Sequence, residues 1–272
     1  FRTEQRHKDA SVDIAASRTL LRNAMKQSKA CIFIGQGFIG GAPDGTTTTL
    51  GREGSDYSAA VAANILDAES MSVWKDVDGI LNADPKVFPD AVQIAELNYL
   101  DTIELAYSGA QIIHPKTIKP LQNKNIPLYV RPFGDKRKPG TVIRRMSAPI
   151  EVPILILKKD QVLLTIRSRD FSFVLEEKFA AIFSLLERYR IKVNLVHNSA
   201  VNLSLCVDNS WHIDEAIQAL RNEEFDVMKV ENMELLTIRG YNGDLMERYA
   251  SGPEVFLLQR TQSTARIVRK NR

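Results

Sequence analysis

The chain has 272 residues, of which 44% are hydrophobic and 25% charged, and its formal net charge is +3. Such a chain is long enough for about two domains with a sizeable core. It contains no apolar run near the roughly 20 residues that cross a bilayer, and its basic residues are scattered except in the tail. We therefore expect a soluble protein that binds neither membrane nor nucleic acid.

Cysteine and histidine usage points to an intracellular protein without a metal centre of its own. Cys31 and Cys206 lie far apart, each inside an apolar run. Buried free thiols in a reducing compartment explain this better than a disulfide, so we expect a cytoplasmic location. The four histidines show no ligand spacing, and no metal held by protein ligands alone is expected.

The N-terminal stretch begins without a pattern and then reads as a helix and a strand. Asp13 or Ser17 could cap the helix, which carries an apolar stripe of Leu20, Leu21 and Met25. Residues 30–34 form a short apolar run followed by glycine. This run predicts a buried strand.

Residues 35–40 read G-x-G-x-x-G, but turn residues follow at 41–45. A dinucleotide site needs a helix that starts within the glycines, so that interpretation is disfavoured. We expect these glycines to let the backbone approach a phosphate or a facing loop.

The polar segment 45–56 runs directly into a small-residue helix at 57–64. As a loop it would present backbone N–H groups and hydroxyls at a helix N-terminus, where the dipole favours anions. Ser55 or Asp56 could cap this helix. Arg52 and Asp56 suit a zwitterionic substrate, because Arg binds a carboxylate bidentately and Asp accepts an ammonium.

The rest of the first half alternates strands and helices. Strands are predicted at 71–74, 126–130 and 139–143, with a helix at 97–109 and another that opens at Pro115. His114 is expected to hold this helix junction rather than to act as an acid or base. Residues 146–153 read as a linker.

The second half has a different order of elements. Strands at 162–166, 193–196, 201–207 and 226–230 and helices at 175–189 and 211–221 follow as strand, helix, strand, strand, helix, strand. This is the ferredoxin-like split βαβ order. Residues 234–240 echo 162–168, so a second unit begins there, although too few residues remain to complete it.

Five ordered blocks carry a family resemblance. They are Gln36-Gly37-Phe38-Ile39-Gly40, Thr48-Thr49-Leu50-Gly51-Arg52-Glu53-Gly54-Ser55-Asp56-Tyr57, Trp74-Lys75-Asp76-Val77-Asp78-Gly79-Ile80, Ala83-Asp84-Pro85-Lys86 and Glu104 to Pro115. The chain resembles aspartate kinases of the amino-acid-kinase superfamily. The resemblance implies an αβα sandwich fragment at 1–145, a ferredoxin-like ACT domain at 154–232 and an incomplete second ACT-like unit at 233–272.

The resemblance also implies a reaction and its site. Aspartate kinases phosphorylate the side-chain carboxylate of L-aspartate with ATP and Mg²⁺. The substrate or phosphate would face Thr48, Gly51, Arg52, Ser55 and Asp56. The nucleotide would contact Lys75, Asp76, Leu81, Asp84, Pro85, Lys86 and Gln111. Four of these differ from common family forms: threonine is common at Lys75 and arginine at Lys86, tyrosine can occur at Leu81 and lysine at Gln111.

ACT domains imply pairing between subunits, as a homodimer or a larger homo-oligomer, and an effector such as lysine or threonine. The expected effector contacts are Val193, Asn194, Asn198 and Ser199. Asn194 stands where the family uses an aspartate for the effector's amine. An ACT unit used for pairing alone therefore stays open.

The lysine-glycine-glycine loop with which family members begin has no counterpart here. We therefore expect a fragment of a longer polypeptide, which by itself lacks catalysis. Three alternatives stay open: another acyl or carbamate kinase of the superfamily, a catalytically inactive amino-acid-sensing regulatory protein, and a kinase fused to a homoserine dehydrogenase.

Overall fold

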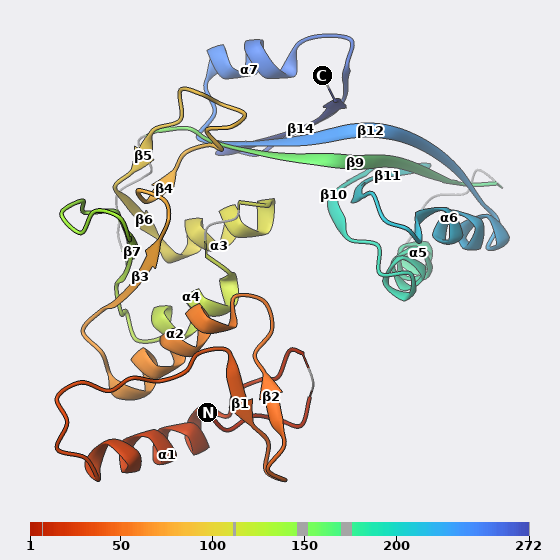
Figure 1. Ribbon diagram of the computed structural model, residues 1–272. Helices are drawn as coiled ribbons and strands as arrows, with labels where there is room; N and C mark the ends of the chain where they lie inside the picture. Colours follow the sequence, from red (N-terminus) through yellow and green to blue (C-terminus); the bar gives the residue numbers. More distant parts are fainter. Residues whose placement is uncertain (7, 111–112, 146–151, 170–175, 272) are drawn as a thin grey trace. The chain divides into compact units, whose positions relative to one another are not determined.

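A computed structural model describes the chain except for residues 7, 111–112, 146–151, 170–175 and 272 (Figure 1). Two compact units, Phe1–Val152 and Pro153–Arg272, make up the chain. The predicted linker 146–153 lies almost entirely outside the described residues. No helix in the described ranges is long and apolar enough to cross a membrane.

The first unit is built on a four-stranded sheet in the order β3-β7-β8-β6. These strands are β3 (Met71–Lys75), β7 (Leu128–Pro132), β8 (Thr141–Arg144) and β6 (Glu96–Asn98). β3 runs parallel to β7, and β6 runs parallel to β8. Alternate side chains such as Met71, Val73, Leu128 and Val130 are buried, as a half-covered sheet requires. Two short hairpins, β1 (Ile39–Gly41) with β2 (Thr47–Thr49) and β4 (Ile80–Leu81) with β5 (Gln93–Ile94), complete its strands.

Four helices accompany this sheet: α1 (Ile14–Lys26), α2 (Gly54–Leu66), α3 (Tyr99–Ser108) and α4 (Pro115–Gln122). α2 packs against α4 and β3. Ala60 and Val61 of α2 are completely buried, so its small residues do allow close packing. Asn64 Nδ2 fixes α2 to α4 by donating to the Pro120 carbonyl at 2.7 Å.

The helix ends follow the sequence signals in most places. Asp13 caps α1 by accepting from the Ala16 N–H, and Gly109 ends α3 with a φ of 114°. Pro115 opens α4, whose N-cap is His114. The predicted structural role of His114 is confirmed, because its Nδ1 accepts from the Lys116 N–H at 3.2 Å.

The predicted strand at 30–34 is wrong. This segment has no regular structure and pairs with no strand in the described part of the chain. Its apolar side chains are consequently exposed, with Ile34 at 98%. Cys31 is exposed as well, so of the two thiols expected to be buried only Cys206 is. An apolar run becomes a strand only where a neighbouring strand can satisfy its backbone.

Two predictions around α2 also fail. Thr47–Thr49 is a strand of the β1–β2 hairpin rather than loop. Neither Ser55 nor Asp56 caps α2, because the helix already starts at Gly54, after Glu53 in the left-handed region at φ 53°. Ser55 and Asp56 therefore lie within the first helical turn.

The second unit has a six-stranded antiparallel sheet in the order β10-β11-β9-β12-β14-β13 (Figure 1). β9 (Ile154–Ser168), α5 (Glu176–Arg188), β10 (Val193–Asn198), β11 (Asn202–Asp208), α6 (Ile213–Asn222) and β12 (Phe225–Arg239) confirm the ferredoxin-like order of elements. Its core joins one face of these strands to α5 and α6, through residues such as Leu164, Ile182, Leu205 and Leu220.

The two longest strands continue beyond this ferredoxin-like part. Residues 154–158 of β9 pair with residues 235–239 of β12. β14 (Thr264–Lys270) pairs with the same part of β12, and β13 (Val255–Arg260) pairs with β14. α7 (Gly243–Ala250) connects β12 to β13. Residues 233–272, predicted as an incomplete second ACT-like unit, thus pair with residues 154–158, a long-range pairing that the local sequence pattern did not reveal.

Candidate active site

A pocket of about 630 Å³ lies in the first unit where α2 begins. Its lining joins the turn before α2 and the start of α2 to four other places in the chain. The lining residues are 51–56, Lys8, Phe38, Thr49 and Lys75. Four of the five residues predicted for substrate, Gly51, Arg52, Ser55 and Asp56, line it together.

Backbone geometry places these groups. Gly51 has a φ of 80° and lies against Asp9, whose Oδ1 would be 2.5 Å from an added Cβ, so a side chain does not fit there. Glu53 follows with a positive φ and accepts from the His114 N–H at 2.8 Å. This bond ties the start of α2 to the start of α4. Gly37 also approaches the start of α2, with its Cβ position 3.1 Å from Ser55 Cα, as expected for a facing loop.

Lys75, at the end of β3, brings a cation to Asp56. Its Nζ donates to Asp56 Oδ2 at 2.8 Å, and the two side chains are only 31% and 18% exposed. Partial burial strengthens an ion pair relative to a fully exposed one. A residue predicted for the nucleotide thus contacts a residue predicted for the substrate.

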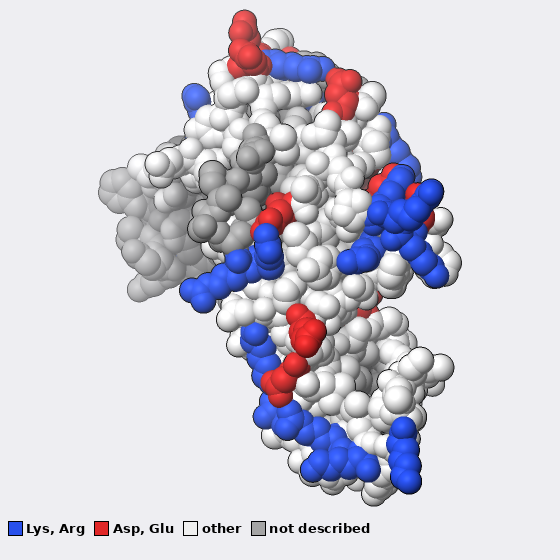
Figure 2. Space-filling view, turned by 90° about the vertical axis from the view of Figure 1, so that its left-hand side faces the viewer, with Lys and Arg blue, Asp and Glu red and all other residues white. Residues whose placement is uncertain are grey.

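Arg52 differs from most cations around it. It is exposed in the pocket and makes no hydrogen bond or ion pair within the described residues. Elsewhere in this unit Arg22, Lys124, Lys138 and Arg144 are paired with carboxylates. Figure 2 shows one face of the molecule, on which the basic side chains form separate groups. Acidic side chains lie beside several of these groups. The Arg52 guanidinium is therefore available to an anion.

The other predicted site residues lie outside this pocket. Thr48 is 2% exposed, and its hydroxyl pairs with that of Thr3 at 2.6 Å. Asp76, Leu81, Asp84, Pro85 and Lys86 follow β3 without lining the pocket, and Asp84 accepts from the Lys86 N–H. Gln111 lies outside the described residues.

Five lining residues, Lys8, Phe38, Thr49, Glu53 and Gly54, were not among the predicted site residues. Lys8 lies in a stretch without a pattern, so only the fold brings it here. Phe38 and Thr49 belonged to recognised blocks, and their neighbourhood to Arg52 was the available signal. No group of three or more His, Cys, Asp or Glu side chains among the described residues could hold a metal ion.

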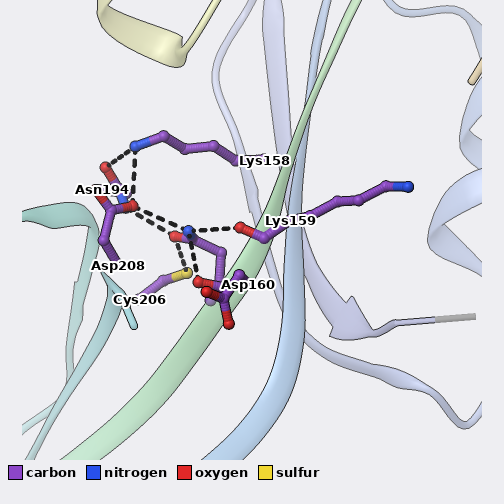
Figure 3. Close-up of polar contacts among 7 residues, drawn as sticks. Lys158, Lys159, Asp160, Asn194, Cys206 and Asp208 are labelled. Carbon is purple, nitrogen blue, oxygen red and sulfur yellow. Dashed lines mark hydrogen bonds and ion pairs between the residues drawn. The ribbon is translucent and has the colours of Figure 1, made fainter. Parts of the chain in front are cut away.

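In the second unit, Asn194 belongs to a polar cluster with Lys158 and Asp208 (Figure 3), to which Gln161 also contributes. Lys158 Nζ donates to Asn194 Oδ1 at 2.7 Å and to Asp208 Oδ1 at 3.0 Å. Asn194 Nδ2 donates to Gln161 Oε1 at 2.7 Å and Asp208 Oδ1 at 2.6 Å. Burial opposes ionisation of Asp208, but the hydrogen bonds from Gln161, Asn194 and Lys158 outweigh it and keep its pKa below the ordinary value.

The four predicted effector residues do not form one site within this chain. Val193 and Asn194 begin β10, whereas Asn198 ends it and Ser199 follows in an exposed turn. Four strand residues span about 13 Å, so the two pairs are well separated. The Ser199 hydroxyl accepts from the Asn202 N–H at 3.2 Å, which closes this turn.

Residues 2–132 match the model of the amino acid kinase family. The match covers just under half of this chain. Over 265 residues the chain is 34% identical to lysine-sensitive aspartokinase 3 of Escherichia coli, covering 94% of this chain and 58% of that protein. It is 36% identical over 209 residues to chloroplastic aspartokinase 1 of Arabidopsis thaliana, covering 72% of this chain and 36% of that protein.

Solved structures extend the likeness to both units. Escherichia coli aspartokinase III in complex with aspartate and ADP matches with a TM-score of 0.78 at 29% identity, covering 99% of this chain and 64% of that one. Clostridium acetobutylicum aspartate kinase matches with a TM-score of 0.80 at 18% identity, covering 95% of this chain and 64% of that one, and shows the fold alone. The chain spans a little over half the length of the Escherichia coli protein.

Proposed function

We propose that the protein is an aspartate kinase, which transfers the γ-phosphoryl group of ATP to the side-chain carboxylate of L-aspartate. The product is 4-phospho-L-aspartate, an early intermediate of lysine, threonine and methionine biosynthesis. One observation carries this proposal: a free guanidinium, Arg52, and a carboxylate, Asp56, line one pocket in a chain similar to aspartokinases.

The two charges match the two ends of an α-amino acid. Arg52 would bind the α-carboxylate with paired N–H donors, and Asp56 would orient the substrate through its ammonium group. Ser55, in the first turn of α2, would add a hydroxyl, and Gly51 allows the turn before α2 to pack against Asp9.

Lys75 suits the transfer step. Phosphoryl transfer depends mainly on positioning and on neutralising charge on the moving group. The Lys75 ammonium lies 2.8 Å from Asp56, so it can face both an acceptor held by Asp56 and a phosphate that arrives beside it. Asp76, Leu81, Asp84, Pro85, Lys86 and Gln111 are proposed for the nucleotide, and Mg²⁺ would arrive with ATP.

The second unit is proposed to pair subunits and to respond to an effector such as lysine. Escherichia coli aspartokinase III, whose fold this chain shares, has been solved in complex with lysine and aspartate. Val193, Asn194, Asn198 and Ser199 remain the proposed contacts. Val193 and Asn194 lie far from Asn198 and Ser199 in one chain. One ligand can therefore contact both pairs of residues only if one subunit contributes the first pair and a second subunit contributes the other. The reaction and the free thiols fit a cytoplasmic location.

The test is ATP turnover by the full natural polypeptide with L-aspartate and Mg²⁺, with hydroxylamine to trap the acyl phosphate. Hydroxamate that forms with L-aspartate and not with L-glutamate, acetate or carbamate is the expected result. Hydroxamate with another acceptor would assign another acyl kinase. Tight binding of an amino acid without any turnover would instead support a sensing protein.

A further inference from the structure

Residues 2–6 and 8–12 of the N-terminal segment lie beside the β1–β2 hairpin, next to the pocket. The Thr3 N–H donates to the Gly41 carbonyl at 3.0 Å, and the Ala10 N–H donates to the Thr49 carbonyl at 3.0 Å. Thr3 and Ala10 are 2% and 0% exposed. This segment is therefore a fixed wall of the site, although its sequence shows no periodic pattern.

Lys116 of α4 fixes the part of this wall nearest the pocket. Its Nζ donates to Asp9 Oδ1 at 2.6 Å and to the Leu50 carbonyl at 3.0 Å, and it lies 4.9 Å from the centre of the Tyr57 ring. The hydrogen bond from Lys116 keeps the pKa of Asp9 below its ordinary value, so Asp9 is ionised near neutral pH. Asp9 in turn packs against Gly51.

Lys8 precedes Asp9 in an unusual conformation. Its φ is 71°, in the left-handed region that costs a residue with a side chain about 1 kcal/mol or more. Lys8 lines the pocket and is exposed, and its ammonium has no hydrogen-bond or ion-pair partner within the described part of the chain.

The remaining charges of the pocket are engaged. Asp56 is paired with Lys75, and Glu53 accepts from the His114 N–H. Lys8 and Arg52 are the two cations of this lining without a partner among the described residues. A pocket with two free cations suits a ligand with two anionic groups, whereas a single carboxylate requires only Arg52.

We propose that Lys8 is a second anion-binding residue of this pocket, which binds an oxyanion that Arg52 does not hold. This inference deepens the proposed function, and under it the oxyanion is the side-chain carboxylate of L-aspartate or the phosphate that it attacks. Lys8 then neutralises charge between acceptor and phosphate, while Lys116 is a positioning residue that acts through Asp9.

The experiment compares Lys8→Gln and Lys8→Arg with wild type in the full natural polypeptide. Lys29→Gln is the control, because Lys29 is exposed and makes no ion pair in the described ranges. Calorimetric titrations use L-aspartate alone, MgADP alone, succinate and inorganic phosphate. Loss of one charge-assisted hydrogen bond predicts binding about tenfold weaker or more for Lys8→Gln. Lys8→Arg and Lys29→Gln should stay within about threefold of wild type.

The ligands identify the oxyanion. If Lys8→Gln binds L-aspartate and succinate more weakly but MgADP and phosphate as tightly as wild type does, Lys8 binds the carboxylate. If it binds MgADP and phosphate more weakly but L-aspartate and succinate unchanged, Lys8 binds the phosphate. Equal binding of all four to wild type and Lys8→Gln overturns the inference and leaves the proposed function untouched. A wild type that binds succinate or phosphate but not L-aspartate removes the proposed function, while the Lys8 comparison still decides the anion site. A wild type that binds none of the four ligands would overturn both the anion site and the proposed function.

Discussion

The pocket of the first unit and the polar cluster of the second unit differ in how their charged groups are paired. In the first, Arg52 and Lys8 face a pocket without partners among the described residues, and even Asp56 has only one. In the second, Lys158, Gln161, Asn194 and Asp208 satisfy one another. A charged group left free on a fixed backbone can gain energy from a ligand, whereas a group already bonded must first lose its partners. The first arrangement is that of a binding site, and the second is that of a structural cluster.

The largest predicted effect concerns Arg52. Arg52→Ala removes two N–H donors to a carboxylate, so kcat/KM for L-aspartate should fall at least about a hundredfold. Arg52→Lys should recover only part of this loss, since the ammonium has no planar fork. The hydroxamate assay measures both. Arg137→Ala is the control, as Arg137 is 91% exposed in a loop. Equal activity of the Arg52 and Arg137 variants would contradict the assigned role.

Asp56 and Lys75 should act as a unit. Asp56→Asn and Lys75→Met are each expected to lower kcat/KM about tenfold or more, and the double variant should be little worse than the poorer single one. Steady-state kinetics of the four proteins provide this cycle. Losses that multiply independently would show that the ion pair does not connect substrate and phosphate. Lys138→Met, which breaks the exposed pair with Asp78, should leave kcat/KM unchanged.

The polar cluster should affect stability instead of catalysis. Asp208→Asn is expected to lower the stability of the second unit by about 1 kcal/mol, because the group is partly solvent-screened. Urea unfolding read by hydrogen exchange of β9 and β11 amides measures this. Asp214→Asn, which removes the exposed partner of Lys229, is the control and should cost about 0.3 kcal/mol or less. Equal effects of the two substitutions would refute the cluster's role.

The same variant has a predictable pH dependence. The pKa of Asp208 is lower in the folded protein than its ordinary value of 3.8. Its contribution is therefore fully present above that value and is lost as the pH falls through the folded-state pKa. The difference in stability between wild type and Asp208→Asn should be constant from about pH 5 to 7 and shrink below about pH 4. A difference that grows on acidification would contradict the lowered pKa.

The smallest effect is a difference between the two thiols. Burial raises the pKa of Cys206 to about 12, and the thiol is completely buried. Cys31 is exposed. Maleimide should modify Cys31 within minutes under native conditions and Cys206 only after unfolding. Mass spectrometry of digested protein reads both sites. Equal labelling rates in the native protein would show that the second unit opens around Cys206.

Interactions between residues close in sequence determined several helix ends and the order of elements in the second half. Asp13, Gly109 and Pro115 mark helix ends through side-chain caps, a left-handed backbone and a missing N–H, all of which act within a few residues. Alternation in the second half was sufficient for the ferredoxin-like order. Arg52, in the turn before α2, and Asp56, in its first helical turn, are only four residues apart, so one short segment brings both to the pocket.

Tertiary structure decided the rest, because the deciding partners are remote in sequence. Residues 30–34 are apolar but find no strand to pair with, and the polar threonines at 47–49 do, in β1. Lys75 reaches Asp56 through the packing of β3 against α2, and residues 154–158 join the second repeat by pairing with residues 235–239. Lys8 reaches the pocket only because Asp9 is held by Lys116, 107 residues further along the chain. Such contacts depend on hydrogen bonds and charges that meet only once the chain is folded, and no local pattern records them.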